Sequence, residues 1–224
     1  MKKMFLLAAA TVIASVSFSQ VRFGAQIIGN AGKTSFETPD EVSFKNSTKI
    51  GFGAGFVSEI PVSESVSIRS SLNYLQKKSG AEFEVPLIPG KKHVINNTLN
   101  YLELPVNLVY NLNGESANIY FGAGPSLGYA LSGKSKYKGW DFDDNNNVVA
   151  VEETTDVFKK DETGAAFKRF DLSANFNAGV QFKNGLFVNG GYLLGLTNLG
   201  SNDDGSYKNR GILLTVGFLL PSNK

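Results

Sequence analysis

The stretch Leu102-Glu103-Leu104-Pro105-Val106-Asn107-Leu108-Val109-Tyr110 decides the fold class. Its even-numbered residues are all bulky and apolar, whereas the other face carries Glu103, Pro105 and Asn107. A period of two is the period of a β-strand, in which successive side chains point to opposite faces. The direction of the apolar face then separates two folds. A soluble barrel turns it inward, and an outer-membrane barrel turns it toward lipid.

Seven further stretches show the same alternation of bulky apolar residues with small or polar ones. Bacterial outer-membrane barrels have an even number of strands, and eight satisfies that requirement. We therefore predict an all-β fold, an eight-stranded antiparallel up-and-down transmembrane β-barrel. The eight predicted strands are Val21–Asn30, Ile50–Ile60, Val66–Gln76, Leu102–Tyr110, Ala117–Leu131, Phe170–Phe182, Leu186–Asn198 and Tyr207–Leu220.

The composition of the two faces favours the membrane barrel. A soluble barrel needs large side chains inside and tolerates lysine and glutamate freely outside. Here the bulky face is aromatic and aliphatic, while the opposite face is rich in glycine, serine and asparagine. This pattern predicts a lipid-facing exterior and a narrow polar interior. A secreted β-sandwich or a lipocalin-like barrel stays open as the alternative, because alternation alone does not report direction.

A few charged residues fall on the face predicted to be interior. An eight-stranded barrel is just wide enough inside for side chains to fill it. We therefore expect these charges to pair as a structural ionic network rather than to act as a selectivity filter. The predicted members are Arg22, Glu59, Arg69, Glu103 and Asp171.

The amino terminus has the pattern of a secretory signal. Lys2 and Lys3 precede the apolar run Met4–Val16, and the small residues of Ser17-Phe18-Ser19 follow. The run is shorter than the ~20 apolar residues that a spanning helix needs. We predict a signal peptide over residues 1–19, cleaved after Ser19, and one outer-membrane β-barrel domain over residues 20–224.

Charge and composition exclude several classes of function. Loss of the signal removes two lysines from 22 basic residues, which leaves 20 against 20 acidic ones, and a neutral chain argues against nucleic-acid binding. The absence of cysteine excludes disulfides and thiol chemistry. The one histidine, His93, follows a Pro-Gly-Lys-Lys turn and is expected in a solvated loop. We predict that the protein is not an enzyme.

The connections between the predicted strands alternate strictly in length. Those at 61–65, 113–116 and 183–185 are short, and those at 31–49, 77–97, 132–169 and 199–206 are long. Outer-membrane barrels have short turns in the periplasm and long loops outside, so we predict that both termini are periplasmic. Pro105 and Pro125 lack the N–H that a strand ladder uses, and we expect a bulge or bend near each.

The long connection at 132–169 contains a pattern of oxygen-bearing side chains. They occupy positions one, three, five, seven and twelve of a calcium-loop spacing, although no predicted helices flank them. The alternative is an acidic surface loop that pairs with its own lysines or contacts lipopolysaccharide phosphates and partner proteins. Trp140 lies in the same connection and either anchors such a contact or covers the barrel mouth. The candidate calcium residues are Asp141, Asp143, Asn145, Asn147 and Glu152.

Three segments carry a resemblance to a known family. Tyr101–Val106, Phe121–Gly128 and Gly191–Asn198 are similar to the corresponding strands of PorT-like outer-membrane β-barrels of Bacteroidota, which are small barrels of the OmpA/OmpX type. The resemblance covers nearly all of the predicted mature chain. It implies the barrel fold and an outer-membrane location, and it transfers no catalytic residue because the family is functionally diverse.

These observations predict an integral outer-membrane scaffold whose long external loops contact other molecules. The expected partners are outer-membrane lipid and lipopolysaccharide and, through the loops, envelope or secretion proteins; no nucleic acid and no cofactor other than the candidate calcium ion is expected. Two alternatives stay open. The first is a component of a secretion or envelope-assembly complex, which the PorT resemblance allows, and the second is a narrow channel for ions or small solutes.

Overall fold

The computed structural model describes residues 21–37, 45–84, 88–159, 167–200 and 206–221, so the predicted signal peptide at residues 1–19 lies outside the described residues. In these ranges no helix has the length and apolar character needed to cross a membrane. The strands are β1 (Arg22–Glu37), β2 (Lys45–Pro61), β3 (Val66–Glu84), β4 (Lys92–Leu112), β5 (Ala117–Phe142), β6 (Val148–Asp156), β7 (Phe170–Phe182), β8 (Leu186–Gly195) and β9 (Ser206–Leu219).

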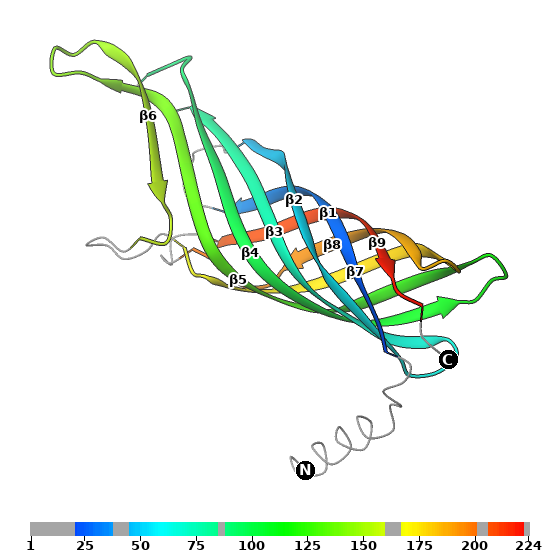
Figure 1. Cartoon of the computed structure of the whole chain (residues 1–224). Helices are drawn as coiled ribbons and strands as arrows, with labels where there is room; N and C mark the ends of the chain where they lie inside the picture. Colours follow the sequence, from blue (N-terminus) through cyan, green and yellow to red (C-terminus); the bar gives the residue numbers. More distant parts are fainter. Residues whose placement is uncertain (1–20, 38–44, 85–87, 160–166, 201–205, 222–224) are drawn as a thin grey trace.

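Eight of these strands close into a ring (Figure 1). The order is β1-β2-β3-β4-β5-β7-β8-β9, and β9 pairs with β1 to complete it. Every pairing is antiparallel, from β1 with β2 through to β8 with β9. The predicted eight-stranded antiparallel barrel is confirmed. Within the described residues β6 pairs with β5 alone, so it is a ninth strand that stands outside the ring.

The strands extend well beyond the predicted ends on one side of the barrel. β3 runs to Glu84, β4 begins at Lys92 and β5 runs to Phe142, so much of 77–97 and 132–169 is paired strand and not loop. The prediction of long loops there was wrong, because these extensions carry polar residues on both faces and lose the alternation that marks the membrane part. Figure 1 shows them rising at the end opposite the carboxyl terminus.

The apolar face of each ring strand points outward. Along Leu102–Tyr110 the even-numbered side chains are exposed, while Glu103 and Asn107 are buried. Phe56 on β2 is 76% exposed and Leu108 on β4 is 62% exposed. A soluble monomer rarely exposes a contiguous apolar patch larger than a few hundred Å². An apolar belt around the whole ring is therefore suited to a hydrocarbon surrounding.

The two prolines interrupt the ladders without changing the register. Pairing of β4 with β5 stops at Pro105↔Ser126 and resumes at Leu108↔Ala123. A Cβ atom on Gly124 would overlap the Val106 carbonyl in this gap, so only glycine fits the close approach of the two backbones. A bulge was expected near each proline, but the register is unchanged across this gap, and the change of register in this pair lies at Asn100/Tyr101.

Apolar side chains form two clusters inside the barrel, one toward each end. Near the short turns, Val57, Phe187 and Leu219 pack together inside the ring. Near the extended strands, a second cluster forms where the chain after β6 folds back into the mouth, and it comprises Leu99, Tyr101, Ala130, Val157 and Phe158, with Phe167 against it. Val57 and Leu219 lie level with Gly24, one inward position beyond the Arg22↔Glu59 pair, so polar side chains continue on the short-turn side of the first cluster.

Candidate functional site

One ionic cluster lies inside the barrel near the short turns. Glu59 on β2 accepts hydrogen bonds from Arg22 on β1 and from Arg69 on β3, with Arg69 Nε 2.7 Å from Glu59 Oε2. Both arginines are the register partners of Glu59 on the neighbouring strands. Because side chains at paired positions share a face of the sheet, the register alone brings the three groups together.

Arg69 also connects this cluster to the opposite wall. Its Nη2 donates to Gln181 Oε1 on β7 at 2.6 Å. The guanidinium lies 4.3 Å from the Tyr120 ring centroid and 5.2 Å from that of Phe187, distances at which a cation is attracted to the ring faces. This end of the interior is therefore filled by paired and stacked side chains.

A second ionic cluster lies toward the extended strands. Lys77 Nζ lies 2.5 Å from Glu103 Oε1 and 3.0 Å from Asp171 Oδ2, which joins β3, β4 and β7. Asn209 of β9 donates to the same Asp171 oxygen at 2.9 Å, and the ammonium lies 4.6 Å from the Tyr101 ring centroid. All three charged side chains are buried.

The five sequence-predicted residues thus lie in the interior but form two clusters rather than one network. Arg22, Glu59 and Arg69 belong to the first, and Glu103 and Asp171 belong to the second. The missing member is Lys77, which falls in the long connection predicted at 77–97. The inward series Ser67, Arg69, Ser71, Asn73 continues with the same period to Lys77, so extending that period would have found it. With Lys77 included, three cations face three carboxylates.

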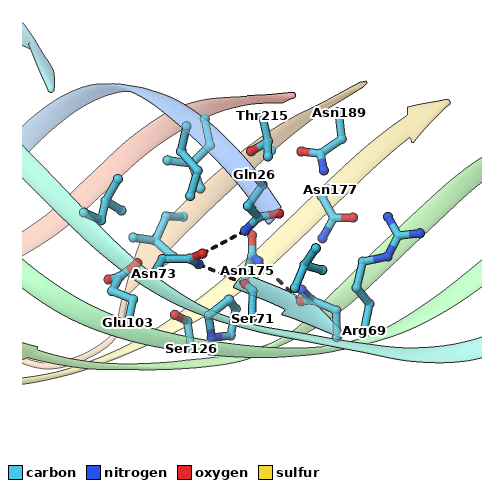
Figure 2. A pocket seen from close by; sticks show the side chains of 18 residues that line it. Gln26, Arg69, Ser71, Asn73, Glu103, Ser126, Asn175, Asn177, Asn189 and Thr215 are labelled. Atoms are coloured by element: carbon cyan, nitrogen blue, oxygen red, sulfur yellow. Dashed lines mark hydrogen bonds between the residues drawn. The ribbon is translucent and has the colours of Figure 1, made fainter. Parts of the chain in front are cut away.

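A small polar cavity of about 60 Å³ separates the two clusters (Figure 2). Gln26 donates to Asn73 Oδ1 at 2.8 Å, and Asn73 donates to Ser71 at 2.9 Å. Ser126 Oγ and Asn175 Oδ1 line the same cavity and have no hydrogen-bond partner in the described part of the chain. The volume is enough for a few water molecules, which need polar partners of this kind. The cavity is too small for a larger solute.

The apolar cluster around Leu99 and Tyr101 lies beside Lys77. Val157 and Phe158 pack on Leu99 and Tyr101, and a Cβ atom on Gly133 would meet both Phe158 and Val157. Arg169 lies with its guanidinium 4.4 Å from the Phe158 ring centroid and donates to the Ala130 carbonyl at 2.9 Å.

Outside the ring, β5 and β6 form a hairpin that projects beyond the mouth (Figure 1). Phe142 pairs with Val148 at its end, and Asp143 shapes the turn. The Asp143 carboxylate accepts from the backbone N–H groups of Asn145 and Asn147, at 2.9 and 2.8 Å, which holds its pKa below the ordinary value. Asn146 has a φ of 64°, the left-handed conformation that asparagine tolerates in tight turns.

The hairpin geometry does not bring the candidate calcium ligands together. Glu152 pairs with Lys138, five positions before Asp143 on the chain, which is about 17 Å along the strand at ~3.4 Å per residue. Its carboxylate is bound by Lys136 and by Lys138, the latter at 2.8 Å, and these lysines lower its pKa to about 2. Across the described ranges no three His, Cys, Asp or Glu side chains are placed to hold a metal ion. The spacing of Asp141, Asp143, Asn145, Asn147 and Glu152 arises from a turn and a strand, not from a calcium loop.

Two aromatic contacts join the hairpin to the rest of the barrel. His93 was expected in solvent but is only 3% exposed, because Lys92 to Leu112 is strand and not loop. Its Nδ1 lies 2.6 Å from the Tyr137 hydroxyl, and its ring stacks on Phe83. Trp140 lies under Lys91, whose Nζ is 3.8 Å from the ring centroid. Trp140 therefore contacts the β3–β4 connection.

The chain matches a known protein family and is similar to several solved structures. The family described as outer membrane protein beta-barrel domain matches residues 12–200. Similar solved structures include Ail, the attachment invasion locus protein of Yersinia pestis, at 14% identity, with 90% of this chain and 99% of that chain covered and a TM-score of 0.40. Neisserial surface protein A is 12% identical, with coverages of 88% and 96% and a TM-score of 0.40. OprG from Pseudomonas aeruginosa is 9% identical, with coverages of 91% and 99% and a TM-score of 0.40. No curated protein sequence matches the chain.

Proposed function

The chain belongs to the family of outer membrane protein beta-barrel domains and is an integral protein of the cell outer membrane, and from this premise we propose that it is an interaction scaffold. In the proposed orientation, both termini and the short turns lie in the periplasm, and the extended strands lie outside the cell. Its proposed partners are lipopolysaccharide and other envelope proteins, and it performs no catalysis.

The small size of the interior cavity is the first support for a scaffold over a channel. The polar cavity is about 60 Å³ and lies between two buried ionic clusters. A solute that crossed would have to displace Lys77 from two carboxylates and then Arg69 from Glu59. Breaking a buried ion pair costs several kcal/mol, so steady conductance is not expected.

The projecting hairpin is the observation that carries the proposal. β6 pairs with β5 on one side only among the described residues, so its other edge presents unpaired backbone groups. Phe142, Val148 and Val149 are exposed near its end. A strand edge beside apolar side chains suits recognition by a partner that adds a strand, a recurring mode of protein interaction.

The same edge supports a second candidate, a component of a secretion or envelope-assembly complex related to the PorT-like barrels of Bacteroidota. In that case the partner is a fixed subunit of an assembly and not a ligand from outside. The two candidate functions predict different complexes when the protein is purified from the membrane. A stoichiometric complex that survives extraction from the membrane favours the assembly, and a transient external contact favours the scaffold.

Photo-crosslinking in cells tests the proposal directly. A photoreactive amino acid placed at Val149 on β6 is expected to yield crosslinks to a defined partner. The matched control at Asn113, an exposed residue in a short turn, is expected to give none of the same products. If the Val149 position yields no crosslink, and shortening the hairpin between residues 139 and 151 leaves the cells unchanged, the scaffold function is wrong. Conductance of the purified protein in a planar bilayer would instead support the channel.

A further inference from the structure

A groove opens on the outer surface of the barrel at the upper limit of the apolar belt. Pairing of β1 with β2 ends at Gly32↔Lys49, although β1 continues along β9 to Glu37 and β2 continues along β3 from Lys45. The two strands therefore separate above this pair. The groove that results has a volume of about 360 Å³, which is within the range of small-molecule sites.

Two cations lie directly opposite each other in this groove. Lys33 on β1 and Arg210 on β9 are register partners, and both are exposed. Like charges at paired positions of an antiparallel sheet repel and destabilise the sheet. Neither residue forms an ion pair with any residue in the described ranges. An anion held between them would relieve the repulsion and match the fork of the guanidinium.

The other lining residues indicate what surrounds the anion. Ala31 and Ile212 lie two residues along their strands from Lys33 and Arg210, on the side of the apolar belt. Ile212 pairs with both Ala31 and Tyr192, and all three line the groove. Above them, Thr48 and Asn46 of β2 contribute polar atoms, and Asn46 Oδ1 is buried without a partner among the described residues. A buried acceptor without a donor is unfavourable, and a ligand hydroxyl or amide would satisfy it.

We propose that this groove binds one phosphorylated glycolipid of the outer leaflet. Its phosphate lies between Lys33 and Arg210, a sugar hydroxyl or amide donates to Asn46 Oδ1, and the acyl chains follow Tyr192 and Ile212 into the bilayer. The two cations are the charge complement of a phosphate at the level where lipid headgroups begin. The proposal rests on the proposed function in one respect, since the groove must face the outer leaflet.

Native mass spectrometry of the refolded protein in nanodiscs of phosphatidylcholine tests the site. The probes are bisphosphorylated lipid A, the same lipid without its phosphates, and phosphatidylglycerol. We expect one tightly retained lipid A. The double variant K33A/R210A is expected to bind at least about tenfold more weakly, since both charged contacts to the phosphate are removed. The control K134A/K183A removes the same charge elsewhere and is expected to bind like the parent protein. Circular dichroism establishes that each variant is folded.

Three results would overturn the proposal. Equal binding of the lipid without phosphates removes the anion site, and equal binding of phosphatidylglycerol removes the assignment to a glycolipid. Unchanged binding by folded K33A/R210A moves the site elsewhere. Because this assay uses no partner protein, its failure is distinct from failure of the hairpin crosslinking, which tests the scaffold function.

Discussion

Replacement of Lys77 by methionine probes the buried ionic cluster most sharply. Lys77 is 6% exposed and is the cation in contact with both Glu103 and Asp171, whose side chains are 5% and 0% exposed. Methionine retains much of the volume and removes the charge, which leaves two buried carboxylates without their ammonium. Removing one partner of a buried pair costs about 3–5 kcal/mol. We therefore expect K77M to lose about 4 kcal/mol of unfolding free energy.

The assay is reversible urea unfolding in lipid vesicles, followed by circular dichroism at neutral pH. For a urea slope of about 2 kcal/mol per molar, the expected shift of the midpoint is about 2 M. K183M serves as the matched control, because Lys183 is an exposed lysine in a short turn, and it is expected to change the free energy by less than about 0.5 kcal/mol.

A compensating variant separates lost charge balance from lost packing. In K77M/E103Q/D171N all three charges are removed together, and replacing a whole buried ionic group is often neutral or stabilising. This variant is expected to regain most of the stability that K77M loses. The reasoning is refuted if K77M stays within about 1 kcal/mol of the parent protein, or if the triple variant is no more stable than K77M.

Three further predictions follow from other parts of the barrel. Gly124→Ala is expected to cost about 1–3 kcal/mol of unfolding free energy in the same assay, because its Cβ would overlap the Val106 carbonyl. Gly190→Ala is the control and is expected to be neutral, because its Cβ would have no atom within 4 Å. Equal effects of the two substitutions would contradict this reasoning. Leu104→Arg is expected to cost about 2–4 kcal/mol in lipid vesicles because it places a charge against hydrocarbon, and a neutral result would contradict the lipid-facing assignment. Glu152 is expected to titrate near pH 2 by NMR: because its folded pKa is depressed below 4.5, the ion pairs are fully present above that value and are lost as pH falls through about 2. A midpoint near 4.5 would show that the lysine contacts do not persist in solution.

The membrane part of the fold was predictable because one physical requirement governs every strand there. Lipid outside and a narrow polar interior require apolar and polar side chains to alternate along each strand. A single stretch such as Leu102 to Tyr110 therefore predicts a membrane strand without knowledge of the strands beside it. Outside the belt that requirement ends. Lys77 to Glu84 and Lys92 to Asn100 pair as strands although both of their faces are largely polar, and composition alone does not distinguish them from loops.

The members of the candidate site were predictable from the sequence, but their arrangement was not. The inward charges were found because each stands out against glycine, serine and asparagine on its own strand. Their division into two clusters depends on the register between strands, for example Glu59 opposite Arg69 and Asn73 opposite Glu103, which a single sequence does not contain. The calcium spacing failed because a turn at Asp143 and a strand pairing at Glu152 reproduce it by coincidence.

The central claim is that the apolar face of the ring meets lipid, and fluorescence quenching tests it most directly. The chain contains no cysteine, so single cysteines at Leu108 and at Asn145 can each carry one fluorophore without a background signal. In vesicles containing brominated lipid, the label at position 108 is predicted to be quenched by the lipid and protected from aqueous iodide, and the label at position 145 is predicted to show the reverse. A label at position 108 that iodide quenches and brominated lipid does not would contradict the outward direction of the apolar face, and with it the membrane barrel.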